Sequence, residues 1–274
     1  MKKQFYTRIR SACICSLVLL NVLFLLSTPT AKLVRAQAPV LQGSAKYSDN
    51  IGPLDPLLWP GNNLDKDAAR SLLRDPSQES AIWAQIPSWE AGEWAGNQAV
   101  NTRAIRYING APIDVKPLGV HTSIGKFNKG YLRDAKGNVW HLFNSDYWTE
   151  TQLEDCTLMS YVVFCSPGGG DYPDFYAESV DFKVIKPINQ IQSVRKAKTW
   201  TRYTNLGSGT LKEDSVRTNF DQQGHATATS FNTALSKQTA PFSAYEQSFA
   251  TKPNIVKSFH NYLHLHGLDS LIPK

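Results

Sequence analysis

The chain has 274 residues, of which 42% are hydrophobic and 19% are charged, and its formal net charge is +6. Six of the 29 basic residues and none of the 23 acidic ones lie in the first 36 positions, so the remainder is formally neutral. A neutral chain lacks the basic surface that binding to a nucleic-acid backbone requires, and we therefore expect no nucleic-acid partner.

The first 36 residues have the pattern of a secretory signal peptide. Basic residues precede an apolar run from Ala12 to Leu26, and small residues at Val34 and Ala36 mark a cleavage site. The run is shorter than the roughly 20 residues of a membrane-spanning helix. We predict export to the periplasm or the outside of a bacterial cell, with no transmembrane segment after cleavage. An uncleaved anchor is the alternative.

Residues 37–80 are predicted to form an extended lead-in that ends with a short helix. Asn63 can cap this helix, Leu64, Ala68 and Leu72 repeat at helical spacing, and Pro76 ends it. Residues 81–274 are predicted to form one domain.

Alternating segments separated by turn residues dominate this domain. They predict an antiparallel up-and-down barrel or a strongly curved sheet of about eight to ten strands. The Asn109-Gly110 pair predicts a hairpin. Two turns of one form are predicted at 134–137 and 221–224, and a C-terminal helix is predicted over 253–266. The expected strands are 98–108, 118–124, 127–133, 138–144, 147–154, 161–165, 178–186, 191–204, 209–220 and 225–235.

Cys156 and Cys165 are the two cysteines left after signal removal, and an oxidising compartment favours a disulfide between them. In one straight strand their Cα atoms would lie about 30 Å apart at about 3.3 Å per residue, whereas a disulfide needs less than about 7 Å. The disulfide therefore requires a turn, which we place near Thr157 to Ser160. Without a turn the thiols remain free.

The string Gly92-Glu93-Trp94 resembles the Gly-x-Trp element that opens the first strand of calycins, the lipocalins and their relatives. The resemblance implies a barrel flanked by helices over roughly residues 82–266, with Trp94 closing one end. It also implies a basic partner for this ring, for which Arg202 and Arg217 are candidates. Through Val139-Trp140-His141, residues 219–224 and the ending Leu268 to Pro273, the chain further resembles secreted β-rich cyanobacterial proteins, a likeness that implies no activity.

A calycin-like barrel has room for one small ligand. The leading function is therefore non-catalytic binding of an apolar or conjugated molecule in an aromatic pocket. The alternative is that the same rings fill the barrel as ordinary core. The expected lining residues are Trp94, Trp140, Phe143, Tyr161, Trp200 and Tyr203.

Two binding alternatives stay open. His260, His264 and His266 are the densest group of possible metal or haem ligands, and the first two lie one helical turn apart. The alternative is that these histidines bind no ligand and form the polar face of a terminal helix. The loops 144–149 and 166–177 can instead carry an envelope-interaction function through aromatic side chains, namely Tyr147, Trp148, Tyr172, Phe175 and Tyr176.

Catalytic signatures are nearly absent from the sequence. It contains no Gly-x-Ser-x-Gly string, no phosphate-binding glycine loop and no dinucleotide fingerprint. Asp146 and Glu150 could form an acid–base pair in a sugar site, although surface carboxylates are the commoner interpretation. No cofactor or catalytic residue is assigned.

Overall fold

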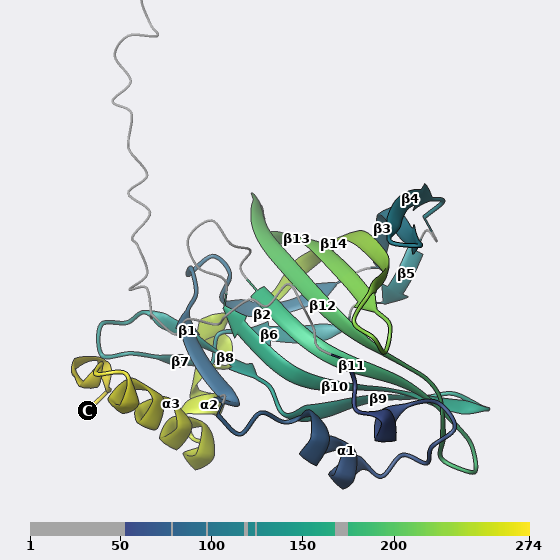
Figure 1. Ribbon diagram of the computed structural model, residues 1–274. Helices are drawn as coiled ribbons and strands as arrows, with labels where there is room; N and C mark the ends of the chain where they lie inside the picture. Colours follow the sequence, from purple (N-terminus) through teal and green to yellow (C-terminus); the bar gives the residue numbers. More distant parts are fainter. Residues whose placement is uncertain (1–52, 78, 97, 118–119, 124, 168–174) are drawn as a thin grey trace, which may run out of the picture. The chain divides into compact units, whose positions relative to one another are not determined.

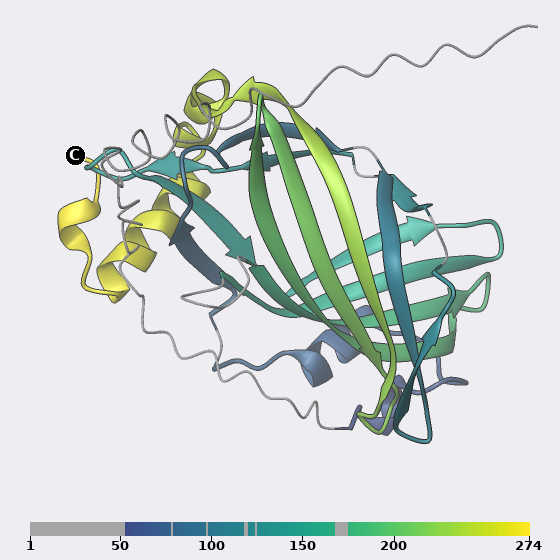
Figure 2. The ribbon, with the colours of Figure 1, turned by 90° about the horizontal axis from the view of Figure 1, so that it is seen from above.

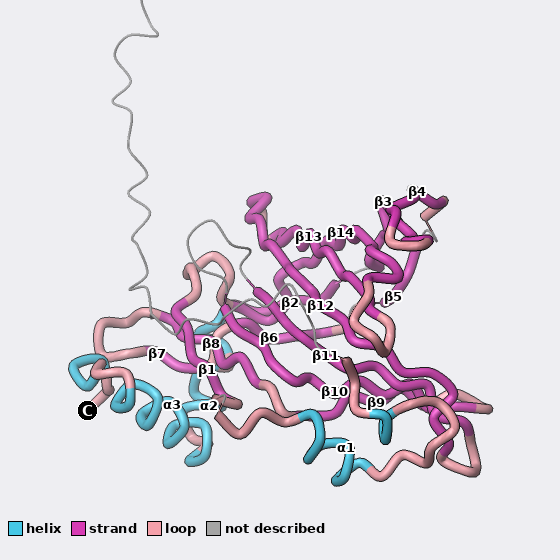
Figure 3. Tube along the Cα trace, in the orientation of Figure 1, coloured by secondary structure: helices cyan, strands magenta, loops and turns pink. Residues whose placement is uncertain are grey.

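The computed structural model describes residues 53–274, except residues 78, 97, 118–119, 124 and 168–174. The predicted signal peptide lies outside these residues. Strands dominate the described chain (Figure 3), which confirms the mostly β fold class. Among the described residues, no helix combines the length and the apolar character needed to span a membrane.

The strands follow one another in chain order. They are β1 (Ala81–Gln85), β2 (Gly92–Gly96), β3 (Gln98–Ile108), β4 (Ala111–Val115), β5 (Val120–Ser123), β6 (Lys126–Lys129), β7 (Leu132–Arg133), β8 (Val139–Asn144), β9 (Tyr147–Gln152), β10 (Cys156–Pro167), β11 (Phe175–Ile185), β12 (Gln190–Gly207), β13 (Thr210–Phe220) and β14 (Ala226–Pro241). The helices are α1 (Lys66–Leu73), α2 (Glu246–Ala250) and α3 (Pro253–Leu265), with short 3-10 turns at Pro56–Leu58, Phe242–Ala244 and Asp269–Leu271.

The large sheet is an antiparallel meander in the order β4-β3-β14-β13-β12-β11-β10-β9. Strand β14 is long enough to pair twice, with β3 along its first half and with β2 along its second half, and β6 pairs with β2. Within the described chain, β4 and β9 pair on one side only, so the sheet is strongly curved rather than closed into a barrel (Figures 1 and 2).

The curvature brings distant strands together across one face. Strands β6 and β12 are four positions apart in the pairing order, which is about 19 Å in a flat sheet. Nevertheless, Nζ of Lys129 on β6 lies 3.1 Å from the ring centroid of Tyr203 on β12. We call the face that carries Tyr203 the inner face and the opposite one the outer face.

The outer face of β10–β12 packs under the N-terminal segment. Leu58 and Leu64 join Phe182 and other apolar residues of these strands in one buried cluster. Helix α1 is capped by Asp65 rather than by Asn63, because the Asp65 carboxylate accepts hydrogen bonds from the backbone of Asp67 and Ala68. The predicted apolar repeat of Leu64, Ala68 and Leu72 was partly wrong, since Leu64 is buried but Leu72 is exposed.

A small second sheet, β1-β8-β7, carries the C-terminal helix (Figure 1). Trp83 and Trp140 of this sheet are buried against Phe259 and Leu263 of α3. The predicted helix over 253–266 is confirmed with a boundary shifted by one residue.

The turn chemistry predicted the hairpins correctly. Asn109 and Gly110 both have positive φ, of 53° and 78°, which a two-residue hairpin with the twist of its strands requires. The turn at 221–224 closes through the Asp221 carboxylate, which accepts hydrogen bonds from the backbone N–H groups of Gln223 and His225. Gly224 takes the left-handed conformation, with φ of 87°.

The disulfide prediction is wrong. Cys156 and Cys165 are free and buried at opposite ends of β10. The turn expected near Thr157 to Ser160 is absent, because these residues pair continuously with both β9 and β11. Nine residues of extended strand separate the thiols far beyond bonding distance.

We therefore expect reducing agent to leave both the mass and the melting temperature of the chain from residue 37 onward unchanged. Both thiols are buried, and burial raises the pKa of Cys165 to about 12, so alkylation by iodoacetamide should require denaturation. Intact mass spectrometry with and without reductant checks this expectation. A gain in mass on reduction would contradict it.

Candidate functional site

The structure distributes the predicted aromatic lining over separate parts of the core. Trp140 packs against Phe259 (ring centroids 5.5 Å apart), and Tyr161 packs against Trp148 (5.0 Å). Both Trp140 and Tyr161 are fully buried. Phe143 is also buried and stacks on Phe175 of β11. A role of these rings in ligand binding stays a prediction, but they do not form one surface.

Trp200 and Tyr203 lie on opposite faces of the sheet, because they are three positions apart on β12. Trp200 packs against Tyr176 at 5.3 Å, whereas Tyr203 lies under the Lys129 ammonium on the inner face. They cannot line the same pocket.

Trp94 is buried on β2, and its indole N–H donates to the backbone oxygen of Glu90 at 2.9 Å. The carboxylate of the same Glu90 forms a buried ion pair with Nζ of Lys129 at 2.6 Å. Neither predicted basic partner has this position, since Arg217 pairs with Asp181 and Arg202 is exposed.

The histidines of the C-terminal helix have individual partners. His264 hydrogen-bonds to Asp269 at 2.7 Å, and His266 contacts Glu79 at 3.3 Å and the ring of Tyr262. His260 is half-buried near the ring of Phe259. In the described parts of the chain, no group of three or more histidine, cysteine or acidic residues could hold a metal ion.

The described aromatic residues of the two loops do not form an exposed patch. Tyr147 is 43% exposed, but Trp148 packs on the outer-face cluster and Tyr176 is buried. Phe175 is half-buried, and Tyr172 lies outside the described residues.

Asp146 and Glu150 form ion pairs with α1. The Asp146 carboxylate accepts hydrogen bonds from Nε and Nη2 of Arg70, each at 2.7 Å, and from the hydroxyl of Tyr161. Glu150 pairs with Lys66. The hydrogen bond from Arg70 holds the pKa of Asp146 at about 2. These carboxylates connect the helix to the β8–β9 hairpin.

A hollow of about 160 Å³ lies on the outer face, between the N-terminal segment and β10–β12. Leu54, Leu73, Val163 and Lys196 are among its lining residues. Its volume is below the roughly 300–1,000 Å³ that small-molecule sites usually have, so it does not suit a pigment or a haem.

The inner face of β11–β14 is polar, because alternate positions on four neighbouring strands carry small or hydrogen-bonding side chains. Thr199 lies opposite Arg217, and Arg217 lies opposite Ser230. These side chains are buried or half-buried. The inner-face residues in this region are Ser179, Asp181, Ala197, Thr199, Thr201, Ser215, Arg217, Asn219, Ala228, Ser230 and Asn232.

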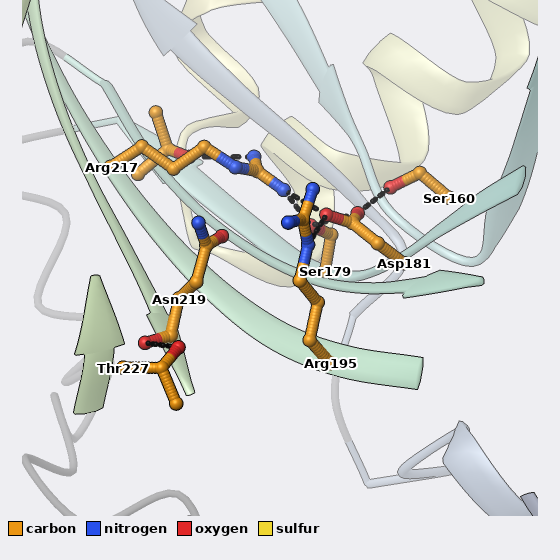
Figure 4. Close-up of polar contacts among 8 residues, drawn as sticks. Ser160, Ser179, Asp181, Arg195, Arg217, Asn219 and Thr227 are labelled. Atoms are coloured by element: carbon orange, nitrogen blue, oxygen red, sulfur yellow. Dashed lines mark hydrogen bonds and ion pairs between the residues drawn. The ribbon is translucent and has the colours of Figure 1, made fainter. Parts of the chain in front are cut away.

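Asp181 is the centre of a charge network on this face (Figure 4). Its carboxylate accepts hydrogen bonds from Nη2 of Arg217 at 2.5 Å, from Nε of Arg195 at 3.3 Å and from Oγ of Ser160 at 2.8 Å. Burial acts to raise the pKa of Asp181, but the charge of Arg217, its hydrogen bond and that of Ser160 outweigh burial, and the pKa is lowered. Asp181 is therefore a carboxylate at neutral pH.

Asn219 lies beside this network (Figure 4), two residues after Arg217 on β13. Its side-chain oxygen is buried and has no hydrogen-bond partner among the described residues. A buried amide oxygen without a hydrogen-bond partner costs free energy.

A second group of ionisable side chains lies around Lys129, near the other end of the inner face. Burial raises the pKa of Glu213, although the Lys129 charge opposes this effect. Burial and the same charge lower the pKa of His141 to about 3. Because the backbone N–H of Gly130 donates to Nδ1 of His141 at 3.2 Å, the neutral ring carries its proton on Nε2.

Comparison of the chain with models of protein families, with curated proteins and with solved structures gave no match. The candidate site is therefore argued from the geometry of its own residues.

Sequence reasoning missed Asp181, Arg195 and Asn219 as one group. A signal was nevertheless present, because polar residues alternate on four successive strands, as in Ser179-x-Asp181, Thr199-x-Thr201, Ser215-x-Arg217-x-Asn219 and Ser230-x-Asn232. Such alternation predicts a polar face on each strand. The predicted binding residues were instead the large aromatic residues of the same strands, such as Trp200 and Tyr203.

Proposed function

We propose that this chain is an exported, non-catalytic binding protein that holds a small ligand on the inner face of its curved sheet. The observation that carries the proposal is the polar inner face over β11–β14, where the curvature half-buries hydrogen-bonding side chains. Several of these groups have partners within the protein, as Arg217 has in Thr199 and Asp181, but the buried Asn219 oxygen has none among the described residues. A polar group withdrawn from water without a partner costs free energy, so a ligand that supplies this partner gains affinity.

A calycin-like ancestry is part of this proposal. Three features support it: the antiparallel meander, the Gly-x-Trp string on β2 paired to the last strand β14, and the helix that follows the strands. Export to the periplasm or the cell exterior is proposed from the signal-peptide pattern alone.

A binding function suits the state of the groups that could transfer protons. Asp146 is ion-paired to Arg70, and His141 is a half-buried ring that its pKa of about 3 keeps neutral. An interaction function through aromatic loops is less well supported, since Tyr147 is exposed but Trp148 and Tyr176 pack inside the protein.

Native mass spectrometry of the mature protein, purified from its own export compartment, tests the proposal. We expect an added mass that is lost on denaturation. Ser230→Trp places a large ring beside Arg217 on the inner face and should remove the adduct. Leu235→Trp, on the same strand but on the outer face where Leu235 is 45% exposed, should retain it.

Both variants must keep the wild-type circular dichroism spectrum for the comparison to count. Ser215→Tyr, on the neighbouring strand, is a second inner-face variant if Ser230→Trp does not fold. An adduct that persists in the folded inner-face variants would overturn the proposal, as would wild-type protein without any adduct.

A further inference from the structure

We propose that the ligand is a small hydroxylated acid, whose anionic oxygens bind Arg195 beside the positive charge of Arg217 and whose hydroxyl group binds Asn219. This inference rests on the proposed function, because it names the chemistry of a ligand on the same inner face. The classes that fit are sugar acids and sugar phosphates.

The charge balance of the network favours an anion. Arg195 and Arg217 bring two positive charges to one carboxylate, that of Asp181. Glu213, the acidic residue of β13 on the inner face, lies near Lys129. Asp221, just after β13, directs its carboxylate to the backbone N–H groups of its own turn. One positive charge on the inner face is therefore not balanced by the network itself.

Arg195 has the donors that such an anion needs. It reaches Asp181 through Nε, and its two terminal nitrogens make no hydrogen bond within the part of the chain that the structure describes. Its side chain is 57% exposed, so these nitrogens are accessible. A guanidinium presents its donors in a planar fork that matches a carboxylate or a phosphate.

Arg217 is held in place by the protein. Its terminal nitrogens donate to Thr199, Ser179 and Asp181. Its side chain is only 31% exposed, so its charge acts on a ligand through less water than that of a surface arginine. We assign it a positioning and electrostatic role, and Arg195 the direct contact.

Asn219 adds the requirement for a hydroxyl group. It is the cross-strand neighbour of Ala197, which is two residues from Arg195 on β12. Diagonal neighbours of this kind have Cβ atoms about 7–8 Å apart, within reach of one small molecule. A hydroxyl can donate to the unpartnered Asn219 oxygen while the acid group of the same ligand accepts from Arg195.

The side chains next to Asn219 on this face are small. Ser179, Ala197 and Ala228 are small and lie in the same cross-strand row as Asn219. An apolar ligand would leave the Arg195 donors and the Asn219 oxygen without partners, which the proposed acid avoids.

Isothermal titration calorimetry at low ionic strength tests the inference, with D-glucuronate, glucose 6-phosphate and glucose as probes. We expect at least one acid to bind about tenfold more tightly than glucose, a difference of about 1.4 kcal/mol. The better acid identifies the source of the charge: a carboxylate if it is glucuronate, and a phosphate if it is the sugar phosphate.

The variants separate the direct contact from general electrostatics. Arg195→Gln should weaken binding of the acid about tenfold or more and leave glucose binding unchanged. Asn219→Ala should weaken it severalfold. Arg202→Gln is the matched control, because Arg202 is exposed on the outer face of the same strand, and it should bind like wild type.

The inference is overturned if neither acid binds more tightly than glucose, or if Arg195→Gln and Arg202→Gln have the same effect. Native mass spectrometry distinguishes this failure from that of the proposed function. An adduct that Ser230→Trp removes and Arg195→Gln retains would overturn the acidic ligand and leave the inner-face binding site standing.

Discussion

Replacing Phe259 by alanine is expected to lower the free energy of unfolding by about 3–5 kcal/mol, the usual cost of truncating a buried aromatic residue. Phe259 has no exposed surface. Its ring lies 4.9 Å from that of Trp83 and 5.5 Å from that of Trp140. The alanine variant would leave a cavity between the C-terminal helix and the small sheet, and urea denaturation measures the loss.

Leu265→Ala is the matched control on the same helix. Leu265 is 73% exposed, so its truncation should change the free energy of unfolding by less than about 0.5 kcal/mol. Equal effects of the two substitutions would show that α3 is not packed on the small sheet as described.

Asp181→Asn is expected to destabilise the protein by about 2–4 kcal/mol at neutral pH. The amide keeps the shape of the carboxylate but removes the negative charge that pairs with both Arg195 and Arg217. The two positive charges then repel each other without compensation. Removing one partner of a buried ion pair typically costs about 3–5 kcal/mol. The cost should be smaller here because both arginines are partly exposed.

The pH dependence follows from the lowered pKa of Asp181. A carboxyl group with a lowered pKa in the folded state stabilises the protein above its unfolded pKa of about 3.9. This contribution is lost as the pH falls through the folded value. The stability difference between wild type and Asp181→Asn should therefore be full at neutral pH and shrink below about pH 4.

Asp114→Asn supplies the comparison with a surface pair. Asp114 also binds an arginine, Arg103, but both side chains are more than half exposed. We expect an effect of less than about 1 kcal/mol. If Asp181→Asn had no larger effect than this variant, the central network would be no more than a surface ion pair.

Local sequence signals predicted most of the elements. The Asn109-Gly110 hairpin, the two Asp-x-x-Gly turns and the helix beginning at Pro253 all appear in the structure. These features depend on a few neighbouring residues, whose preferred φ angles and capping bonds are properties of the local chain. The strand at 156–167 was misjudged because a disulfide was expected to require a turn within it.

The assignment of residues to faces depended on register, which local signals do not contain. A shift of one residue moves every side chain of a strand to the other face. Trp200 was therefore expected inside and packs against Tyr176 on the outer face, whereas the less conspicuous Thr199 and Arg217 lie on the inner one.

The sequence by itself determined the mostly β class, the antiparallel order of the meander and the position of its main turns, because each depends on short-range preferences. Only the tertiary structure decided that the sheet stays open, that Phe259 is buried between two tryptophans, and that Asp181 meets Arg195 and Arg217. Those contacts join residues from different strands and helices, and their energies arise only when packing brings the side chains together.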